Sequence, residues 1–265
     1  QASWLAIGLP VVNPDPEPVW TNPLNGNIVM ANGGDTDDGD GDSILEFTPG
    51  APGTFVKAYC DGDQLEQAVA TFTGAAISAF RNNEWNGLTV NSNGAVILPI
   101  DDDGATATDA WLQRVNPTST FAAPSIDILL GSTAPNGPID GTIASTINGN
   151  TLFMLQLRTR GIAETRITKF DTTSAPQANP ALPLLPVDFV FLTQTELLAV
   201  MPESDLDALN AVAVVPSGLD SAPLLILVCG RPDLVAPAPA SMNLYAIPVD
   251  KSAPLALYKS GASIA

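Results

Sequence analysis

The residues with the clearest chemical potential form an acidic segment near the start of the chain. Five aspartates lie within eight residues, and glycines separate the last three of them. Calcium prefers several oxygen ligands, and glycine lets a chain wrap tightly around the ion. The segment therefore predicts a calcium loop, with a solvated hairpin tip as the alternative. Its carboxylates are Asp35, Asp37, Asp38, Asp40 and Asp42.

Several other kinds of reactive site are excluded by the residue types present. The chain has no histidine, which removes histidine-based catalytic triads and histidine-ligated zinc. It also has no Gly-x-Ser-x-Gly elbow and no phosphate-binding glycine motif. The two cysteines, Cys60 and Cys229, are too few for a metal cluster. They indicate either one disulfide that closes a long loop or two buried free thiols.

Three short motifs resemble those of a known family. They are Glu17-Pro18-Val19-Trp20, Asn86-Gly87-Leu88 and Pro138-Ile139-Asp140-Gly141. They are similar to the inner-strand motifs of the regucalcin and gluconolactonase β-propellers. The resemblance implies that Glu17, Asn86 and Asp140 ligate a central divalent metal used in lactone hydrolysis. The alternative is that the Asn-Gly and Asp-Gly pairs simply form turns.

The elements that must position these residues are short strands. The chain has 21 glycines and 24 prolines, which separate apolar segments rich in valine, isoleucine, leucine and threonine. This pattern is typical of many strands joined by turns. The pairs Asn25-Gly26, Asn93-Gly94 and Asn148-Gly149 each precede an apolar strand. Each pair predicts a hairpin with a type I′ turn.

Each hairpin is followed by another strand-like segment, at 44–47, 111–115 and 166–170. Units that recur roughly every 45 to 70 residues with several strands each favour an all-β fold. We expect a β-propeller of about five blades, within a range of about four to six, with β-sandwich domains as the alternative. Further strands are expected at 196–201, 224–229, 243–249 and 255–258, and helices only at 64–80 and 203–210.

The start of the chain differs from the rest. Residues 4–12 are apolar, and the prolines of 13–18 predict a stiff spacer. We therefore divide the chain into a leader strand with its spacer, 1–18, and a propeller-like domain, 19–265. The leader is expected either to complete the chain's own last sheet or to add to a neighbouring subunit's sheet edge. Its self-association residues are Trp4, Leu5, Ile7, Leu9 and Val11.

The charge balance limits the kinds of partner. The chain has 28 acidic and 10 basic residues, a net charge of −18, and only 14% charged residues. Nucleic-acid binding is excluded, because no basic patch exists to neutralise phosphates. No apolar run is long enough to span a membrane. The first residue is glutamine rather than methionine, which predicts a mature secreted protein located outside the cell.

Three functions from different classes fit these observations. The first is a structural subunit of an extracellular filament or surface layer, a homo-oligomer or polymer whose copies associate through the leader strand. The second is an extracellular binding module that uses calcium to hold a carbohydrate or a protein. The third is the metal-dependent lactonase-like hydrolase that the family resemblance implies. We favour the non-enzymatic subunit, because low charge density leaves apolar surface that subunit contacts would cover.

Overall fold

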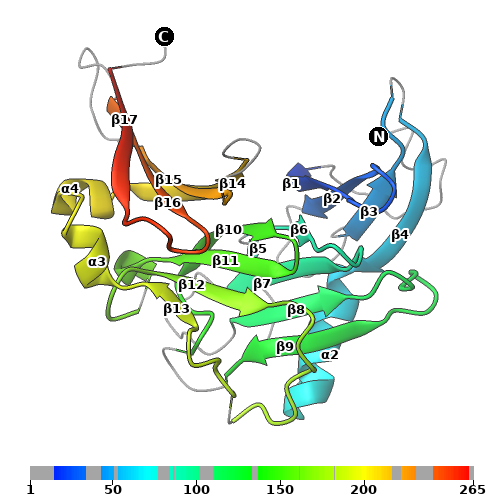
Figure 1. Ribbon diagram of the computed structural model, residues 1–265. Helices are drawn as coiled ribbons and strands as arrows, with labels where there is room; N and C mark the ends of the chain where they lie inside the picture. Colours follow the sequence, from blue (N-terminus) through cyan, green and yellow to red (C-terminus); the bar gives the residue numbers. More distant parts are fainter. Residues whose placement is uncertain are drawn as a thin grey trace. The chain divides into compact units, whose positions relative to one another are not determined.

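The computed structural model describes residues 15–33, 43–50, 53–76, 84–85, 87–101, 110–132, 137–160, 162–181, 183–216, 222–230 and 241–262. The chain forms two compact units (Figure 1). The first consists of Gln1–Asp140 and Asp171–Leu185, and the second of Gly141–Phe170 and Pro186–Ala265. Within the described residues, each unit holds two antiparallel sheets.

The first unit begins with a sheet whose strands pair in sequence order. These strands are β1 (Asp15–Thr21), β2 (Ile28–Gly33), β3 (Ser43–Phe47) and β4 (Phe55–Asp61). Its second sheet contains β5 (Glu84–Trp85), β7 (Val96–Asp101), β8 (Trp111–Val115) and β9 (Ile126–Gly131), and β6 (Thr89–Val90) also pairs with β7. Helix α2 (Gly62–Thr73) follows β4 and packs against β4 and β9.

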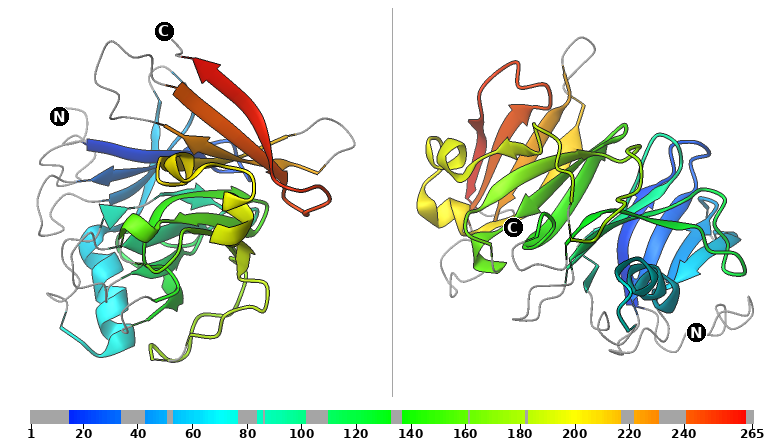
Figure 2. Two further views of the ribbon diagram at one scale, coloured as in Figure 1. Left: turned by 90° about the vertical axis from the view of Figure 1, so that its left-hand side faces the viewer. Right: turned by 90° about the horizontal axis from the view of Figure 1, so that it is seen from below.

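The second unit repeats this sequential pairing. One sheet contains β10 (Thr142–Asn148), β11 (Thr151–Gln156), β12 (Arg166–Asp171) and β13 (Val190–Leu192). The other contains β14 (Leu209–Val215), β15 (Leu224–Cys229), β16 (Ser241–Pro248) and β17 (Ala256–Ala262). The short helices η2 (Arg158–Arg160), α3 (Gln194–Leu198) and α4 (Glu203–Leu206) occupy the connections, and Figure 2 shows α3 and α4 beside the last sheet.

The all-β fold class is confirmed. Three of the sheets in the described residues are antiparallel meanders of consecutive strands, and in the remaining sheet β5 and β6 both pair with β7 before β8 and β9 follow in order. Meanders arise where short loops join neighbouring strands, as the dense turn residues of the sequence predict. Whether the sheets close into a ring, and hence the propeller and its blade number, stays a prediction, as does the β-sandwich alternative.

The three predicted Asn-Gly hairpins are confirmed, but their turns are not of type I′. Gly26, Gly94 and Gly149 have φ of 72°, 77° and 63°, whereas the described asparagines before them do not have positive φ. In the second hairpin, Asn91 N–H donates to Ala95 O at 3.0 Å, which closes a loop that ends on the left-handed glycine. The Asn91 side-chain oxygen also accepts bonds from the Asn93 and Ala95 N–H groups at 3.0 Å, so the loop is held without a left-handed conformation at Asn93.

The helices differ from the predicted ranges at identifiable residues. α2 begins with a capping box between Asp61 and Gln64, and it ends at Gly74, whose φ of 73° terminates it before residue 80. The strand predicted at 196–201 is wrong, because a second capping box between Thr193 and Glu196 starts helix α3 there. Among the described residues, no helix has the length and apolar character needed to cross a membrane.

The predicted proline spacer is partly a strand. β1 starts at Asp15, so the boundary placed at residue 18 falls inside the first sheet. Proline is compatible with this position because β1 is an edge strand and its pairing is irregular between Pro16 and Val19. Only residues 13 and 14 then separate the apolar segment 4–12 from β1.

Each unit has its own apolar core. In the first unit, the fully buried Trp111 packs edge-on against Phe72 of α2, with ring centroids 5.9 Å apart. Gly131 lies against the same indole, and a Cβ at this position would come within 2.1 Å of Trp111 Cε3. In the second unit, Phe153 and Phe191 pack edge-on with centroids 5.1 Å apart. Edge-on aromatic pairs stabilise a core beyond the area that they bury.

Candidate functional site

All of the predicted calcium-loop and self-association residues, and one family-motif residue, lie outside the described residues. These are Asp35, Asp37, Asp38, Asp40 and Asp42, the family-motif residue Asn86, and the leader residues Trp4, Leu5, Ile7, Leu9 and Val11. Glu17 belongs to β1, of which only the backbone is described at that position. Within the described part of the chain, no three acidic or cysteine side chains gather as a metal site. Calcium binding therefore stays a prediction.

Asp140 is the one proposed metal ligand whose side chain is described. It is only 2% exposed, and its Oδ2 accepts a hydrogen bond from the Gly137 N–H at 2.5 Å. The next residue, Gly141, has a φ of 72°, which favours glycine. A carboxylate that holds its own loop backbone, followed by a left-handed glycine, is typical of an Asp-Gly turn. This local geometry corresponds to the turn alternative, and it leaves the predicted metal role of Asp140 untested.

Both cysteines are free and buried in the structure, which corresponds to the alternative of two thiols. Cys60 lies in a core of the first unit and Cys229 in the core of the second. Burial raises the pKa of both thiols, and Asp205 adds to the effect at Cys229, whose pKa rises to about 12. A thiol with such a pKa stays protonated at neutral pH, so neither cysteine is an activated nucleophile.

The most concentrated set of polar contacts surrounds Glu46 on β3. This carboxylate is only 2% exposed, and its Oε2 accepts a hydrogen bond from the Tyr59 hydroxyl at 2.8 Å. Its Oε1 accepts bonds from three amide groups of the first hairpin loop at 3.4, 2.8 and 2.7 Å; the donors are Asn22, Asn25 and Asn27. Burial raises the pKa of Glu46, but the hydrogen bonds from Asn27, Asn25 and Tyr59 lower it by more. The pKa therefore lies below its usual range.

Glu46 therefore holds a loop rather than serving as a base. The Glu46 carboxylate accepts each of these hydrogen bonds, so its oxygen lone pairs are engaged and its charged form is favoured. Lys57 Nζ lies 3.7 Å from the centroid of the Tyr59 ring and donates to Pro117 O at 2.6 Å. The sequence analysis did not find this cluster. No local sequence pattern marks it, because the cluster depends on the register that pairs Glu46 with Val29, close to the asparagine-rich loop.

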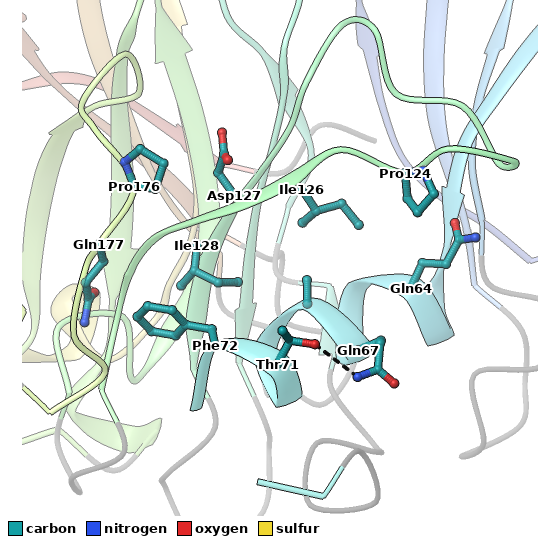
Figure 3. Close-up of a pocket in the computed structure, with 11 residues that line it drawn as sticks. Gln64, Gln67, Thr71, Phe72, Pro124, Ile126, Asp127, Ile128, Pro176 and Gln177 are labelled. Carbon is teal, nitrogen blue, oxygen red and sulfur yellow. Dashed lines mark hydrogen bonds between the residues drawn. The ribbon is translucent and has the colours of Figure 1, made fainter. Parts of the chain in front are cut away.

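An open groove of about 450 Å³ lies between α2 and β9 in the first unit (Figure 3). Thr71 and Phe72 line it from the helix, and Ile126 and Ile128 line it from the strand. Gln177, from the segment between β12 and β13, also lines the groove. In Figure 3, Phe72 lies next to Ile128. This volume is within the usual range for sites that hold small ligands.

The polar groups at the groove are largely bound within the protein. Asp127 forms an ion pair with Arg114 at 2.6 Å, so its charge is neutralised. The Gln177 amide accepts from Gly131 N–H at 2.9 Å and donates to Gly131 O at 3.0 Å, which occupies part of the β9 edge. Gln67 donates to Thr71 Oγ1 at 3.2 Å. The groove is therefore suited to an uncharged ligand and presents mainly apolar surface.

A second exposed feature is the outer strand of the last sheet. β17 forms one edge of the order β14-β15-β16-β17, and among the described strands it pairs with β16 alone. Leu257 and Tyr258 on this strand are 52% and 62% exposed. An edge strand with apolar side chains and unpaired backbone groups is a template for pairing with another strand.

Comparison with known proteins identifies no relative, since no protein-family model matches the chain and no curated protein matches it in sequence. The resemblance to gluconolactonases therefore still depends on the three short motifs alone. Function must be argued from the chain's own surfaces.

Proposed function

We propose that this protein is a secreted structural subunit of an extracellular assembly, whose copies join by β-strand addition. The observation that carries this proposal is the exposed apolar edge strand β17, with Leu257 and Tyr258 open to solvent. Soluble proteins usually protect such edges with charges, prolines or a covering element. β17 carries one charged residue, Lys259, but the neighbouring Leu257 and Tyr258 leave an exposed apolar stretch to which another strand can bind.

The low charge density of the chain supports the same function. Only 14% of its residues are charged, against about 25% in an average soluble domain. The net charge is −18, so two copies of the chain repel each other electrostatically. Contacts between copies are therefore expected where charges are few, as on the leader segment 1–14, which has no charged side chain.

The leader segment supplies the strand that is added. Its residues 4–12 are apolar, and β1 begins only a few residues later, at Asp15. The connection allows Val12 to lie no more than about 10 Å from the start of β1. A strand held so closely by its own subunit projects from a fixed point. This arrangement favours regular assembly over random aggregation.

The test compares the full-length protein with a variant that lacks residues 1–14. The full-length protein should form oligomers or filaments, seen by light scattering and electron microscopy, and the truncated protein should be a monomer. The thermal melting curve of the truncated protein serves as the control, because β1–β17 should remain folded. A full-length protein that is monomeric at all concentrations, or a truncated protein that still assembles, would refute the proposal.

The groove between α2 and β9 favours a second candidate function, an extracellular module that binds an uncharged carbohydrate with the help of calcium. Its neutral walls and the Phe72 ring support this alternative. Calcium should then raise the melting temperature, and chelation should reverse the rise. Thr71→Arg, which fills the groove, should abolish binding on a glycan array, whereas Thr21→Arg outside the groove should not. A melting temperature that does not change with calcium, together with no binding of the protein to any glycan on the array, would count against this function.

A further inference from the structure

The pairing of β17 with β16 concentrates apolar groups at the free edge of the last sheet. Leu244 pairs with Lys259 and Tyr245 with Leu257, so Tyr258 is an extra residue on β17. A bulge of this kind places two residues opposite one, here Leu257 and Tyr258 opposite Tyr245. Both are more than half exposed, whereas Tyr245 is buried. The edge therefore presents an apolar patch that continues from the buried core.

The last sheet does not need the leader of its own chain. β14, β15, β16 and β17 already form a four-stranded meander, as many strands as the meander β1–β4 contains. A leader strand paired with β17 would be a fifth strand, added to a four-stranded sheet that the chain forms without it. Among the described strands, β17 has no partner on its other side, and that side has room for a strand from outside the subunit.

We infer that the edge of β17 accepts the leader strand of a second copy of this chain, an inference that rests on the proposed function. In a strand, alternate side chains point to opposite faces of the sheet. The leader then presents four large aliphatic side chains on one face, those of Leu5, Ile7, Leu9 and Val11. Its other face combines Trp4 and Val12 with Ala6, Gly8 and Pro10.

This alternation matches the two faces of the last sheet at β17. Leu257 lies on the same face as its partner Tyr245, which is buried in the core of the second unit. The leader can place its large side chains on that face, where they cover Leu257. Pro10 lacks an N–H but is compatible with an added strand, since the added strand becomes the new edge. This match fixes which face of the leader lies toward Leu257, because a shift of one residue would exchange the two faces.

The first experiment places charges on the edge. Leu257→Lys combined with Tyr258→Lys should convert the assembled protein into a monomer, as removal of residues 1–14 does. Val56→Lys is the matched control, because Val56 is 45% exposed on β4, the edge strand of another sheet. The control should still assemble. Assembly that survives the double substitution but is lost on truncation would overturn β17 as the acceptor, while it would still support assembly through the leader segment.

The second experiment asks which copy supplies the strand. One protein carries Ala6→Cys and another carries Lys259→Cys; both positions lie on the face opposite Leu257 in the inferred pairing, and the native cysteines are buried. A short bismaleimide added to the mixture should yield a cross-linked dimer of the two variants. The dimer should be absent when the Lys259→Cys partner also carries the two edge lysines. A mixture without the dimer, or a doubly substituted chain that cross-links only within itself, would overturn the inference.

Discussion

Removal of the Glu46 carboxylate is the most informative test of how the first unit is held together. The three shorter hydrogen bonds to Glu46 measure 2.7, 2.8 and 2.8 Å, and the fourth measures 3.4 Å. A bond to a charged group contributes about 1.5–3 kcal/mol when its partner is buried. Asn25 and Asn27 are more open to water than Tyr59, so water replaces part of their loss. We therefore expect Glu46→Ala to lower the free energy of unfolding by about 2–4 kcal/mol.

Glu46→Gln removes the negative charge but keeps the shape of the side chain, so it measures the contribution of the charge to stability. Glutamine keeps one acceptor for the asparagine amides but turns an NH₂ group toward Tyr59, whose hydroxyl can reverse and accept. The expected loss is smaller, about 1–2 kcal/mol. Urea unfolding followed by tryptophan fluorescence measures both variants, because all four tryptophans belong to the first unit. Glu164→Gln, at an exposed residue, is the control for the change in net charge and should leave the midpoint unchanged.

The pH dependence provides a second readout for the same variant. Burial raises the pKa of Glu46, the hydrogen bonds lower it by more, and its folded-state pKa lies below the ordinary value of 4.5. Its contribution to stability is therefore complete above pH 4.5 and is lost as the pH falls through the lower folded-state pKa. The difference between wild type and Glu46→Gln should shrink over that range. Equal urea midpoints at neutral pH, or a difference that does not change with pH, would refute the reasoning.

The remaining predictions concern Gly131 and the cysteines. Gly131→Ala should lower stability by about 2–4 kcal/mol, because its Cβ would overlap the Trp111 ring; a thermal melt equal to that of wild type would contradict this packing. Cys60 and Cys229 should not react with Ellman's reagent in the folded protein, since burial raises the pKa of both thiols. Two thiols should appear in denaturant without reductant, whereas none would indicate the disulfide.

Local sequence chemistry was sufficient to predict much of the secondary structure. Asn-Gly pairs located three hairpins, β1–β2, β6–β7 and β10–β11, and the density of turn residues predicted antiparallel sheets. The same reasoning failed at 196–201, where Thr193 and Glu196 form a capping box that a search for apolar strands overlooks. It also extended α2 past Gly74, although a glycine in that position is a frequent helix end.

Local sequence chemistry could not identify the residues of the Glu46 cluster, of the Trp111 packing or of the groove. Glu46 meets Tyr59 and three asparagines only because the strands β2, β3 and β4 align in one register. The same dependence holds for Gly131, whose importance comes from Trp111 on the neighbouring strand. The groove likewise combines α2, β9 and residues 176 and 177, which are far apart along the chain.

The order of the amino acids thus set the fold class, the positions of the hairpins, the excess of negative charge and the uncharged leader segment, because each depends on neighbouring residues or on composition. The folded arrangement set the two cysteines as separate buried thiols, the Glu46 cluster and the exposed edge of β17. These depend on which strands become neighbours and which strand is left at an edge. Contacts between residues distant along the chain are fixed by packing and register, and no local pattern encodes them.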